Sequence, residues 1–349
     1  MKKIGILGCG RIAQVRHIPE LAQNANVQLA GYYNPTRSRA EEMARKYGGQ
    51  VYDSVEQMLE DNSIDAVVVC LANSAHAPVC IRALQAGKDV LCEKPMATTL
   101  EECEAMVQAS KQSGHLLLIA QNQRLTRAHQ EAKRMILEGK IGRVLTFRTT
   151  FGHGGPERWS INPGKGTWFF NKEKAAMGAM ADLGIHKTDL IQWLLSEPVV
   201  KVSAHVTTLD KTGPDGTLIP VDDNAICIYT LRNGITGSMT ASWTYYGTED
   251  NSTIIYGTEG ILRIYQNPEF AIELIEKDGK KTPFDVEPIQ TNDHQTRSGM
   301  TDLFIEAIET GKETGLTARE VLPAMRAIFA ALESSRTGQA IDIPENKDL

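Results

Sequence analysis

The sequence predicts an α/β plus α+β protein. We expect an N-terminal Rossmann domain with a doubly wound parallel sheet, followed by a C-terminal α/β domain with a large, mostly antiparallel sheet. Three observations support this prediction: apolar runs alternate with helical patterns up to residue 122, β-rich segments dominate after residue 143, and a glycine-rich turn follows the first apolar run. The 349 residues also exceed what one core usually holds. The expected domains are a dinucleotide-binding domain at 1–122 and a substrate-binding and oligomerisation domain at 123–349.

The N-terminal part contains five short apolar runs that lack the polar alternation of half-exposed strands. Such runs are typical of parallel strands buried on both faces, and the helical patterns between them provide the covering layers. This alternation predicts a doubly wound sheet. The expected strands are 3–7, 27–33, 65–71, 88–92 and 115–120, and the expected helices are 11–24, 36–48, 54–61, 76–87 and 99–113.

The C-terminal part contains β-rich segments whose polarity often alternates. Asn233-Gly234 separates two of them and indicates a type I′ hairpin, and the segment EKDGKK at 276–281 indicates another turn. The segment TARE at 317–320 is a capping box that opens the last of two helices near the end of the chain. The expected strands are 143–151, 199–209, 224–232, 235–244, 253–257, 260–266 and 270–276, with further helices at 127–139 and 179–195.

Composition argues against several classes of partner. The net charge of −6 and a pI near 5.8 argue against nucleic acid, which calls for a clustered basic surface. No apolar stretch approaches eighteen residues, so we expect no membrane span. The six cysteines form no C-x-x-C pair and mostly lie in apolar runs. They indicate reduced core residues in a cytoplasmic protein.

The glycine-rich turn is Gly8-Cys9-Gly10-Arg11-Ile12-Ala13, between a predicted strand and a predicted helix. In this context Gly8 allows the tight turn and Gly10 lets the backbone approach a pyrophosphate. Arg11 and Ile12 open a helix whose N-terminal N–H groups and partial positive charge favour phosphate. The turn therefore predicts a dinucleotide cofactor.

The end of the second predicted strand bears on which dinucleotide is bound. An NAD-binding domain normally places Asp or Glu there to hold the ribose 2′-hydroxyl, and here the position is Asn34. Asn34 can bind a ribose hydroxyl, and the missing negative charge would tolerate a 2′-phosphate. Arg37 could pair with that phosphate, although Arg37 and Arg39 could equally be solvated helix charges. The sequence allows either NAD or NADP.

Polar residues follow the third and fourth predicted strands at their carboxyl ends, where open parallel sheets bind ligands. Glu93 and Lys94 follow the fourth strand directly, and Pro95 cannot continue it. Asn73 and His76 follow the third strand, although His76 could simply begin a helix. We expect these four polar side chains to line the nicotinamide end of the crevice.

Three segments resemble the glucose–fructose oxidoreductase, inositol dehydrogenase and MocA (Gfo/Idh/MocA) family of NAD(P)-dependent oxidoreductases. They are GILGCGRIA near the N-terminus, NSAHAPVCIRALQAGKDVLCEKPMA at 73–97, and MGAMADLGIHKTDLIQWLL at 177–195. The resemblance covers essentially the whole chain, and the Glu-Lys-Pro triplet is the family's hallmark. It implies that Lys94 contacts the reacting hydroxyl or carbonyl and that Glu93 touches the cofactor near the nicotinamide ribose.

The third segment matches the family's D-x-G-x-H pattern, which implies that Asp182 and His186 lie at the substrate. Their spacing of four residues predicts that one helix presents both on one face, where they can bind sugar hydroxyls and move a proton. We expect no metal, since no third ligand has a convincing spacing. Relatives often carry Gly-Gly-Gly before this helix, whereas this chain has Met177-Gly178-Ala179.

A glycine-rich segment at 152–170 contains aromatic and basic residues and is expected to contact the substrate. Within it Trp168 could stack on a sugar face and Lys165 could donate to hydroxyls or a carboxylate. Arg124, after the fifth predicted strand, could do likewise, although packing roles are about as plausible for the aromatic residues.

These features predict an NAD(P)-dependent dehydrogenase or reductase that transfers hydride between nicotinamide and a secondary alcohol or ketone of a sugar, inositol or related polyol. Lys94, Asp182 and His186 are the expected catalytic residues. The resemblance and the broad second sheet also suggest a homodimer or homotetramer. Two alternatives stay open: a glycoside hydrolase that uses NAD for transient C3 oxidation, and a non-catalytic dinucleotide-binding sensor.

Overall fold

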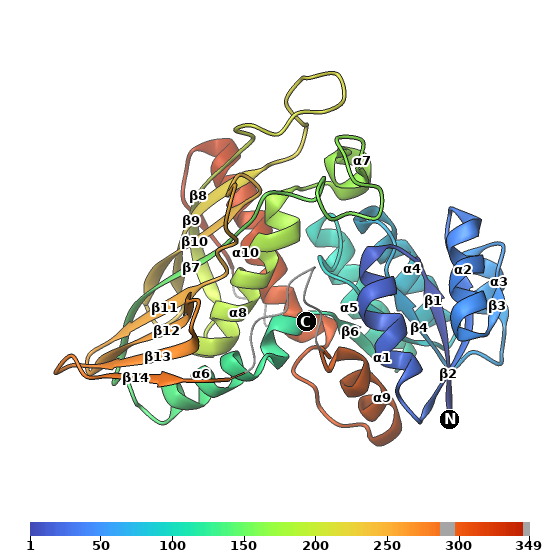
Figure 1. The fold of residues 1–349 in the computed structure, drawn as a ribbon, viewed down its shortest axis with the longest axis horizontal. Coiled ribbons are helices and arrows are strands. Elements are labelled where there is room, and N and C mark those ends of the chain that lie inside the picture. The colour runs from blue at the N-terminus through green and yellow to red at the C-terminus, as the bar shows by residue number, and fades with distance from the viewer. Residues whose placement is uncertain (287–296, 345–349) are drawn as a thin grey trace. The chain divides into compact units, whose positions relative to one another are not determined.

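The computed structural model describes residues 1–286 and 297–344, which form two compact units (Figure 1). The first unit comprises residues 1–122 together with 297–322. The second comprises residues 123–286 together with 323–344. No helix in these ranges is both long and apolar enough to cross a membrane.

The first unit is built on a six-stranded sheet in which every paired strand is parallel. Its order, β3-β2-β1-β4-β5-β6, is the doubly wound arrangement of dinucleotide-binding domains, so the predicted Rossmann sheet is confirmed. All of strand β4 is buried, as the continuous apolar run predicts. The strands are β1 (Lys2–Leu7), β2 (Val27–Tyr33), β3 (Gln50–Val51), β4 (Ala66–Val69), β5 (Asp89–Cys92) and β6 (Leu117–Ile119).

Helices connect these strands, and one returns to them from late in the chain. Glu20, buried on α1, accepts hydrogen bonds from the backbone and hydroxyl of Ser298 and from the Thr301 hydroxyl, so it holds the start of α9 against α1. Helix α4 begins three residues before the expected start. The helices are η1, a π-helical segment (Ala13–His17), α1 (Ile18–Ala22), α2 (Arg37–Tyr47), α3 (Val55–Glu60), α4 (Asn73–Gln85), α5 (Leu100–Ser113) and α9 (Met300–Thr310).

The second unit contains a nine-stranded sheet of order β14-β13-β12-β11-β7-β10-β9-β8-β15. All of its strand pairs are antiparallel except β7 with β10, which confirms the expected mostly antiparallel sheet. A turn joins β9 and β10 as expected, with φ of +86° at Gly234, but Asn233 lacks the positive φ that a type I′ turn requires, so the predicted turn type is wrong. The strands are β7 (Val144–Gly152), β8 (Val199–Thr207), β9 (Asn224–Leu231), β10 (Thr236–Ser242), β11 (Thr253–Gly257), β12 (Gly260–Asn267), β13 (Phe270–Glu276), β14 (Lys281–Phe284) and β15 (Ile341–Asp342).

Helices cover one face of this sheet and leave strand β9 open on the other. Tyr229 of β9 is buried and its hydroxyl lies 2.9 Å from the Thr188 hydroxyl of α8. Ile226 and Ile228, on the opposite face of the same strand, are about half exposed. The helical elements are η2 (Asn122–Leu125), α6 (Arg127–Leu137), η3 (Trp168–Phe170), α7 (Lys172–Ala175), η4, a second π-helical segment (Met180–Gly184), α8 (Ile185–Leu195) and α10 (Ala318–Thr337).

Candidate functional site

The glycine-rich turn between β1 and η1 has the geometry that a dinucleotide requires. Gly8 has φ of +102°, and a Cβ there would lie 2.5 Å from the carbonyl oxygen of Cys70, so only glycine fits. A Cβ on Gly10 would meet no atom within 4 Å. This open space lies directly before the helix that begins at Arg11 and Ile12, whose first N–H groups have no partner within the helix. The turn therefore fits a pyrophosphate.

Asn34, at the end of β2, ties that turn to the neighbouring strand. Its Oδ1 accepts a hydrogen bond of 2.9 Å from the amide of Cys9, and its Nδ2 donates one of 2.9 Å to the carbonyl of Thr36. An asparagine amide has one further N–H and one further lone pair for a ribose hydroxyl. Asn34 thus shapes the turn, and its capacity to bind a ribose is reduced by half.

The two arginines after Asn34 have different surroundings. Arg37 is half exposed and pairs with Glu41 and Asp53 on the surface. The charge of Arg39 reaches Cys9: burial raises the pKa of the Cys9 thiol to about 12, and the guanidinium of Arg39 opposes that rise. The charge of Arg39 therefore acts on Cys9, within the glycine-rich turn.

Glu93 follows β5 and points into the protein. It is buried, and its Oε1 lies 2.7 Å from Nε2 of His17, which belongs to the π-helical segment η1. Burial alone would raise the pKa of Glu93, but the hydrogen bond and charge of His17, with other basic neighbours, hold it at about 2. Glu93 is therefore an ionised carboxylate held from behind by η1.

Lys94 is half-buried and its backbone amide donates a 3.1 Å hydrogen bond to the Glu93 carboxylate. The Lys94–Pro95 peptide is cis. His76 is buried behind it, with Nδ1 2.8 Å from the Pro95 carbonyl and Nε2 3.1 Å from that of Leu71. Burial lowers the pKa of His76. Its ring contacts backbone, which gives it a positioning role for this turn. Asn73 is the buried first residue of α4.

In the second unit, Asp182 lies in the π-helical segment η4, directly before α8. The carboxylate of Asp222 accepts hydrogen bonds of 2.7 Å from the amides of Gly178 and Met180 and so fixes where η4 begins. A Cβ on Gly178 would lie 1.8 Å from the Asp222 carbonyl oxygen. Of the triplet Met177-Gly178-Ala179, the central glycine is the one that the backbone requires.

The expected presentation of Asp182 and His186 by a single regular helix is only partly correct. Both are buried, but a π turn, closed by i→i+5 hydrogen bonds, contains more residues than an α turn. The angular offset between the two side chains therefore differs from that of an α-helix. Oδ2 of Asp182 accepts a 3.0 Å hydrogen bond from the Trp243 indole.

His153 is a further candidate site residue, which the sequence reasoning missed. Its Nε2 lies 3.9 Å from Oδ2 of Asp182, and its Nδ1 accepts a 3.0 Å hydrogen bond from the Gly155 amide. The Phe151 ring lies against both histidines, with centroids 5.8 Å from His153 and 6.1 Å from His186. The available signal was its place after a predicted strand, next to two glycines.

The residue after His186 is a lysine with no exposed surface. Nζ of Lys187 donates a 2.9 Å hydrogen bond to the Asn251 carbonyl and lies 5.9 Å from the centroid of the Phe151 ring. Burial lowers its pKa to about 7, and the acidic residues Glu249 and Asp250 only partly oppose this. A buried amine whose pKa lies near neutral pH therefore lies beside the ring that contacts both histidines.

The Arg124 side chain binds a carboxylate of the protein, which argues against the expected role as a hydrogen-bond donor to the substrate. Its guanidinium forms a two-pronged ion pair with Asp189 of α8, with 2.6 Å between Nε and Oδ2. Both side chains are buried. This pair joins the segment before α6 to the helix that contains His186, which is a positioning function.

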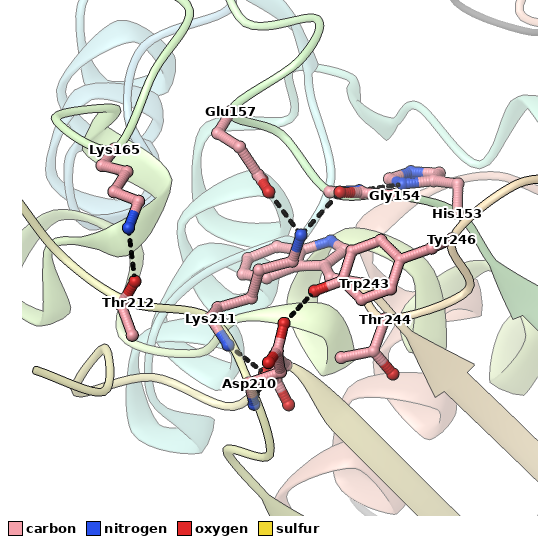
Figure 2. Close-up of polar contacts among 12 residues, drawn as sticks. His153, Gly154, Glu157, Lys165, Asp210, Lys211, Thr212, Trp243, Thr244 and Tyr246 are labelled. Carbon is pink, nitrogen blue, oxygen red and sulfur yellow. Dashed lines mark hydrogen bonds and ion pairs between the residues drawn. The ribbon is translucent and has the colours of Figure 1, made fainter. Parts of the chain in front are cut away.

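Lys165 and Trp168 belong to the loop that follows β7. Nζ of Lys165 donates a 2.7 Å hydrogen bond to the Thr212 hydroxyl (Figure 2). Trp168 stacks on Phe169, which packs edge-on against Trp159, and Trp159 in turn contacts His153. A cavity of about 410 Å³ opens beside Lys165. It is lined by Lys165, Phe170, Gly213, Pro214, Asp215, Thr217, Leu218, Ile219 and Pro220.

In the described ranges no group of three or more His, Cys, Asp or Glu residues could hold a metal ion.

Family models match both units. Residues 2–121 match an oxidoreductase family with an NAD-binding Rossmann fold, GFO_IDH_MocA, and residues 129–263 match the GFO/IDH/MocA C-terminal domain. The chain belongs to the Gfo/Idh/MocA family of oxidoreductases. The predicted family, the NAD(P) cofactor and the assignment as an oxidoreductase are thereby confirmed.

Other family members extend this result. Levoglucosan dehydrogenase of Pseudarthrobacter phenanthrenivorans is 34% identical over 241 residues, which are 63% of this chain and 60% of that enzyme. The scyllo-inositol 2-dehydrogenase (NAD(+)) of Bacillus subtilis is 27% identical, over 98% of this chain and 96% of that enzyme. The crystal structure of aldose-aldose oxidoreductase from Caulobacter crescentus, complexed with glycerol, has a TM-score of 0.83 at 26% identity, covering 98% of this chain and 99% of that one.

Proposed function

We propose that this oxidoreductase transfers a hydride between NAD or NADP and a secondary alcohol or ketone of a sugar, inositol or related polyol. The observation that supports the proposal best is that this chain, a member of the family, contains both the Glu93-Lys94-Pro95 turn and the buried side chains of Asp182 and His186. The relatives named for levoglucosan, scyllo-inositol and aldoses support the same class of substrate.

The cofactor is held, in this proposal, by the glycine-rich turn. Gly8 and Gly10 admit the pyrophosphate, and the helix that begins at Arg11 supplies N–H donors to it. When bound, the nicotinamide supplies the hydride chemistry. Asn34 offers its remaining polar capacity to the ribose, while Arg39 acts on the same turn. These residues suit either dinucleotide.

In this proposal Lys94 binds the reacting oxygen of the substrate, and the buried residues beside Lys94 hold it in place. Its ammonium donates a hydrogen bond to that oxygen and stabilises the negative charge that develops as the alcohol is oxidised. Glu93, ionised and bound to His17, holds the Lys94 backbone through its carboxylate. The His76 ring lies 2.8 Å from the Pro95 carbonyl and holds the next residue of the turn. The turn is thus preorganised by buried groups rather than by solvent-exposed contacts.

His186 takes the alcohol proton during oxidation and returns it during reduction, as a general base and acid. Asp182 accepts a hydrogen bond from a neighbouring hydroxyl of the substrate. The Trp243 indole already binds Oδ2 of Asp182, so the carboxylate is oriented before substrate arrives. Polyols offer adjacent hydroxyls for such contacts, which is why this residue set suits them.

A screen of hexoses, inositols, sugar acids and glycosides with NAD and NADP, read at the nicotinamide absorbance, tests the proposal. We expect net NAD(P)H formation with at least one free sugar or polyol. Glycoside cleavage with bound NAD but without net NAD(P)H would instead establish the redox-assisted hydrolase. Dinucleotide binding with neither reaction would establish the sensor.

We also propose that the open face of the large sheet joins copies of this chain as a dimer or tetramer. Ile226 and Ile228 lie half exposed on that face of β9. The variant Ile226→Glu should reduce the mass measured by light scattering, and a wild-type monomer at micromolar concentration would contradict the proposal.

The six buried, unpaired cysteines suit the proposed cytoplasmic location.

A further inference from the structure

A single lysine holds the first turn of the loop after β7 (Figure 2). Lys211 is buried, and its Nζ donates a 2.6 Å hydrogen bond to the Gly154 carbonyl and pairs with the Glu157 carboxylate. The Tyr246 ring lies 4.6 Å away on another side. An ammonium has three N–H donors, and these groups provide a carbonyl, a carboxylate and an aromatic face. The buried charge is therefore fully compensated.

The backbone that supports Lys211 is itself fixed. Asp223 has no exposed surface, and its carboxylate accepts hydrogen bonds of 2.7, 2.9 and 2.8 Å from the amides of Leu209, Asp210 and Lys211. The carbonyl of Asp223 accepts a 2.7 Å hydrogen bond from the amide of Trp243. Lys211 thus extends from a rigid base that is shared with the tryptophan bound to Asp182.

The Gly154–Gly155 peptide connects Lys211 to His153. The carbonyl of this peptide accepts from Lys211, and its N–H donates 3.0 Å to Nδ1 of His153. A peptide group is planar, so fixing the direction of its carbonyl fixes the direction of its N–H. Because Nδ1 accepts a hydrogen bond, the neutral ring carries its proton on Nε2, the atom 3.9 Å from Asp182.

We infer that Lys211 is a positioning residue that acts through the Gly154–Gly155 peptide to set both the orientation and the tautomer of His153 beside Asp182. Its catalytic consequence rests on the proposed function, in which Asp182 binds a substrate hydroxyl. The contrasting account is a loop tether, in which the Lys211–Glu157 pair only stabilises the second unit.

A double-mutant cycle separates the two accounts. Lys211→Met should lower kcat/KM by about 10- to 100-fold, the scale of a misplaced site group, and His153→Leu by at least as much. The double variant should be no slower than His153→Leu, because Lys211 acts through that ring. Losses that multiply would show that Lys211 acts independently of His153 and would overturn the inference.

Two further variants control for general damage. Tyr246→Phe keeps the ring beside Lys211 and removes only the hydroxyl that binds Asp210, so its kcat/KM should equal that of the wild type. Lys211→Arg keeps a cation that can reach the same acceptors and should recover part of the loss. If Lys211→Met fails to fold, Lys211→Gln, which is polar but uncharged and one atom shorter, replaces it in the cycle.

A readout without substrate keeps the inference testable if the proposed reaction fails. The indole N–H resonance of Trp243, assigned through its absence in Trp243→Phe, reports on the hydrogen bond to Asp182. It should shift in Lys211→Met and His153→Leu, and stay in place in Tyr246→Phe. An unshifted resonance in a folded Lys211→Met protein would overturn the inference whether or not the wild type oxidises a polyol.

Discussion

The fully buried Lys187 should make the stability of the second unit depend on pH. Its pKa in the folded protein is about 7, against an ordinary value of 10.5, because burial disfavours the charged form. Below pH 7 Lys187 is protonated in both the folded and the unfolded state, and the folded state bears the full free-energy cost of burying the charged ammonium. Between pH 7 and 10.5 only the unfolded state keeps the proton, so stability rises with pH in this range.

The size of the effect follows from the two pKa values. The full cost at low pH is about 5 kcal/mol, and between pH 6 and pH 9 it falls by roughly 2 to 3 kcal/mol. Lys187→Met removes the titrating group while keeping most of its volume. The Asn251 carbonyl loses its donor at every pH, so this loss cancels in the comparison.

The assay is urea unfolding followed by tryptophan fluorescence, which reports on the second unit because all four tryptophans belong to it. The free energy of unfolding of Lys187→Met minus that of wild type should be roughly 2 to 3 kcal/mol larger at pH 6 than at pH 9, because only the wild type is destabilised by the buried charge at low pH. Lys174→Met, at an exposed site on α7, serves as the control. A difference between Lys187→Met and wild type that does not change with pH would refute the reasoning.

Three substitutions test other parts of the site. Lys94→Ala should slow hydride transfer by about 10²-fold or more while NADH binding, measured by fluorescence, is retained; wild-type turnover would remove Lys94 from the mechanism. Asn34→Asp should shift the ratio of kcat/KM values toward NAD, and an unchanged ratio would mean that this position does not contact the ribose. Gly178→Ala should destabilise the protein by about 2 kcal/mol or more, because its Cβ would lie 1.8 Å from the Asp222 carbonyl; an unchanged urea midpoint would contradict that contact.

The fold was predictable because buried strands and helices require apolar residues at regular spacings, and these spacings are visible in the sequence. Parallel strands covered on both faces appear as continuous apolar runs, and the glycine of Asn233-Gly234 marks the turn between two strands, although not its type. Strands β3, β14 and β15 were missed because they have only two, four and two residues, too few to show a clear period. The pairing of β3 and β15 depends on neighbours distant in sequence.

The local geometry of the candidate site was predictable only where a single segment defines it. The glycine-rich turn and the Glu93-Lys94-Pro95 turn follow strands whose ends were already evident. By contrast, the Arg124–Asp189 ion pair joins positions 65 residues apart, and the sequence shows only two charged residues. The direction of Glu93 toward His17 depends on the packing of η1 beneath the turn.

The π-helical segments at 13–17 and 180–184 have a consequence for aligning and engineering this chain. A π turn is equivalent to an α-helix with one inserted residue, and it shifts the phase of everything on one side relative to the other. To align this chain with a relative that lacks the inserted residue, a one-residue gap is needed between the positions of Asp182 and His186. Without the gap, each buried position before His186 is aligned with a residue that is not its structural equivalent. Deleting Leu183, which lies between Asp182 and His186, would make the helix regular and rotate the Asp182 carboxylate relative to α8 by about one residue's turn, near 100°, away from the indole of Trp243.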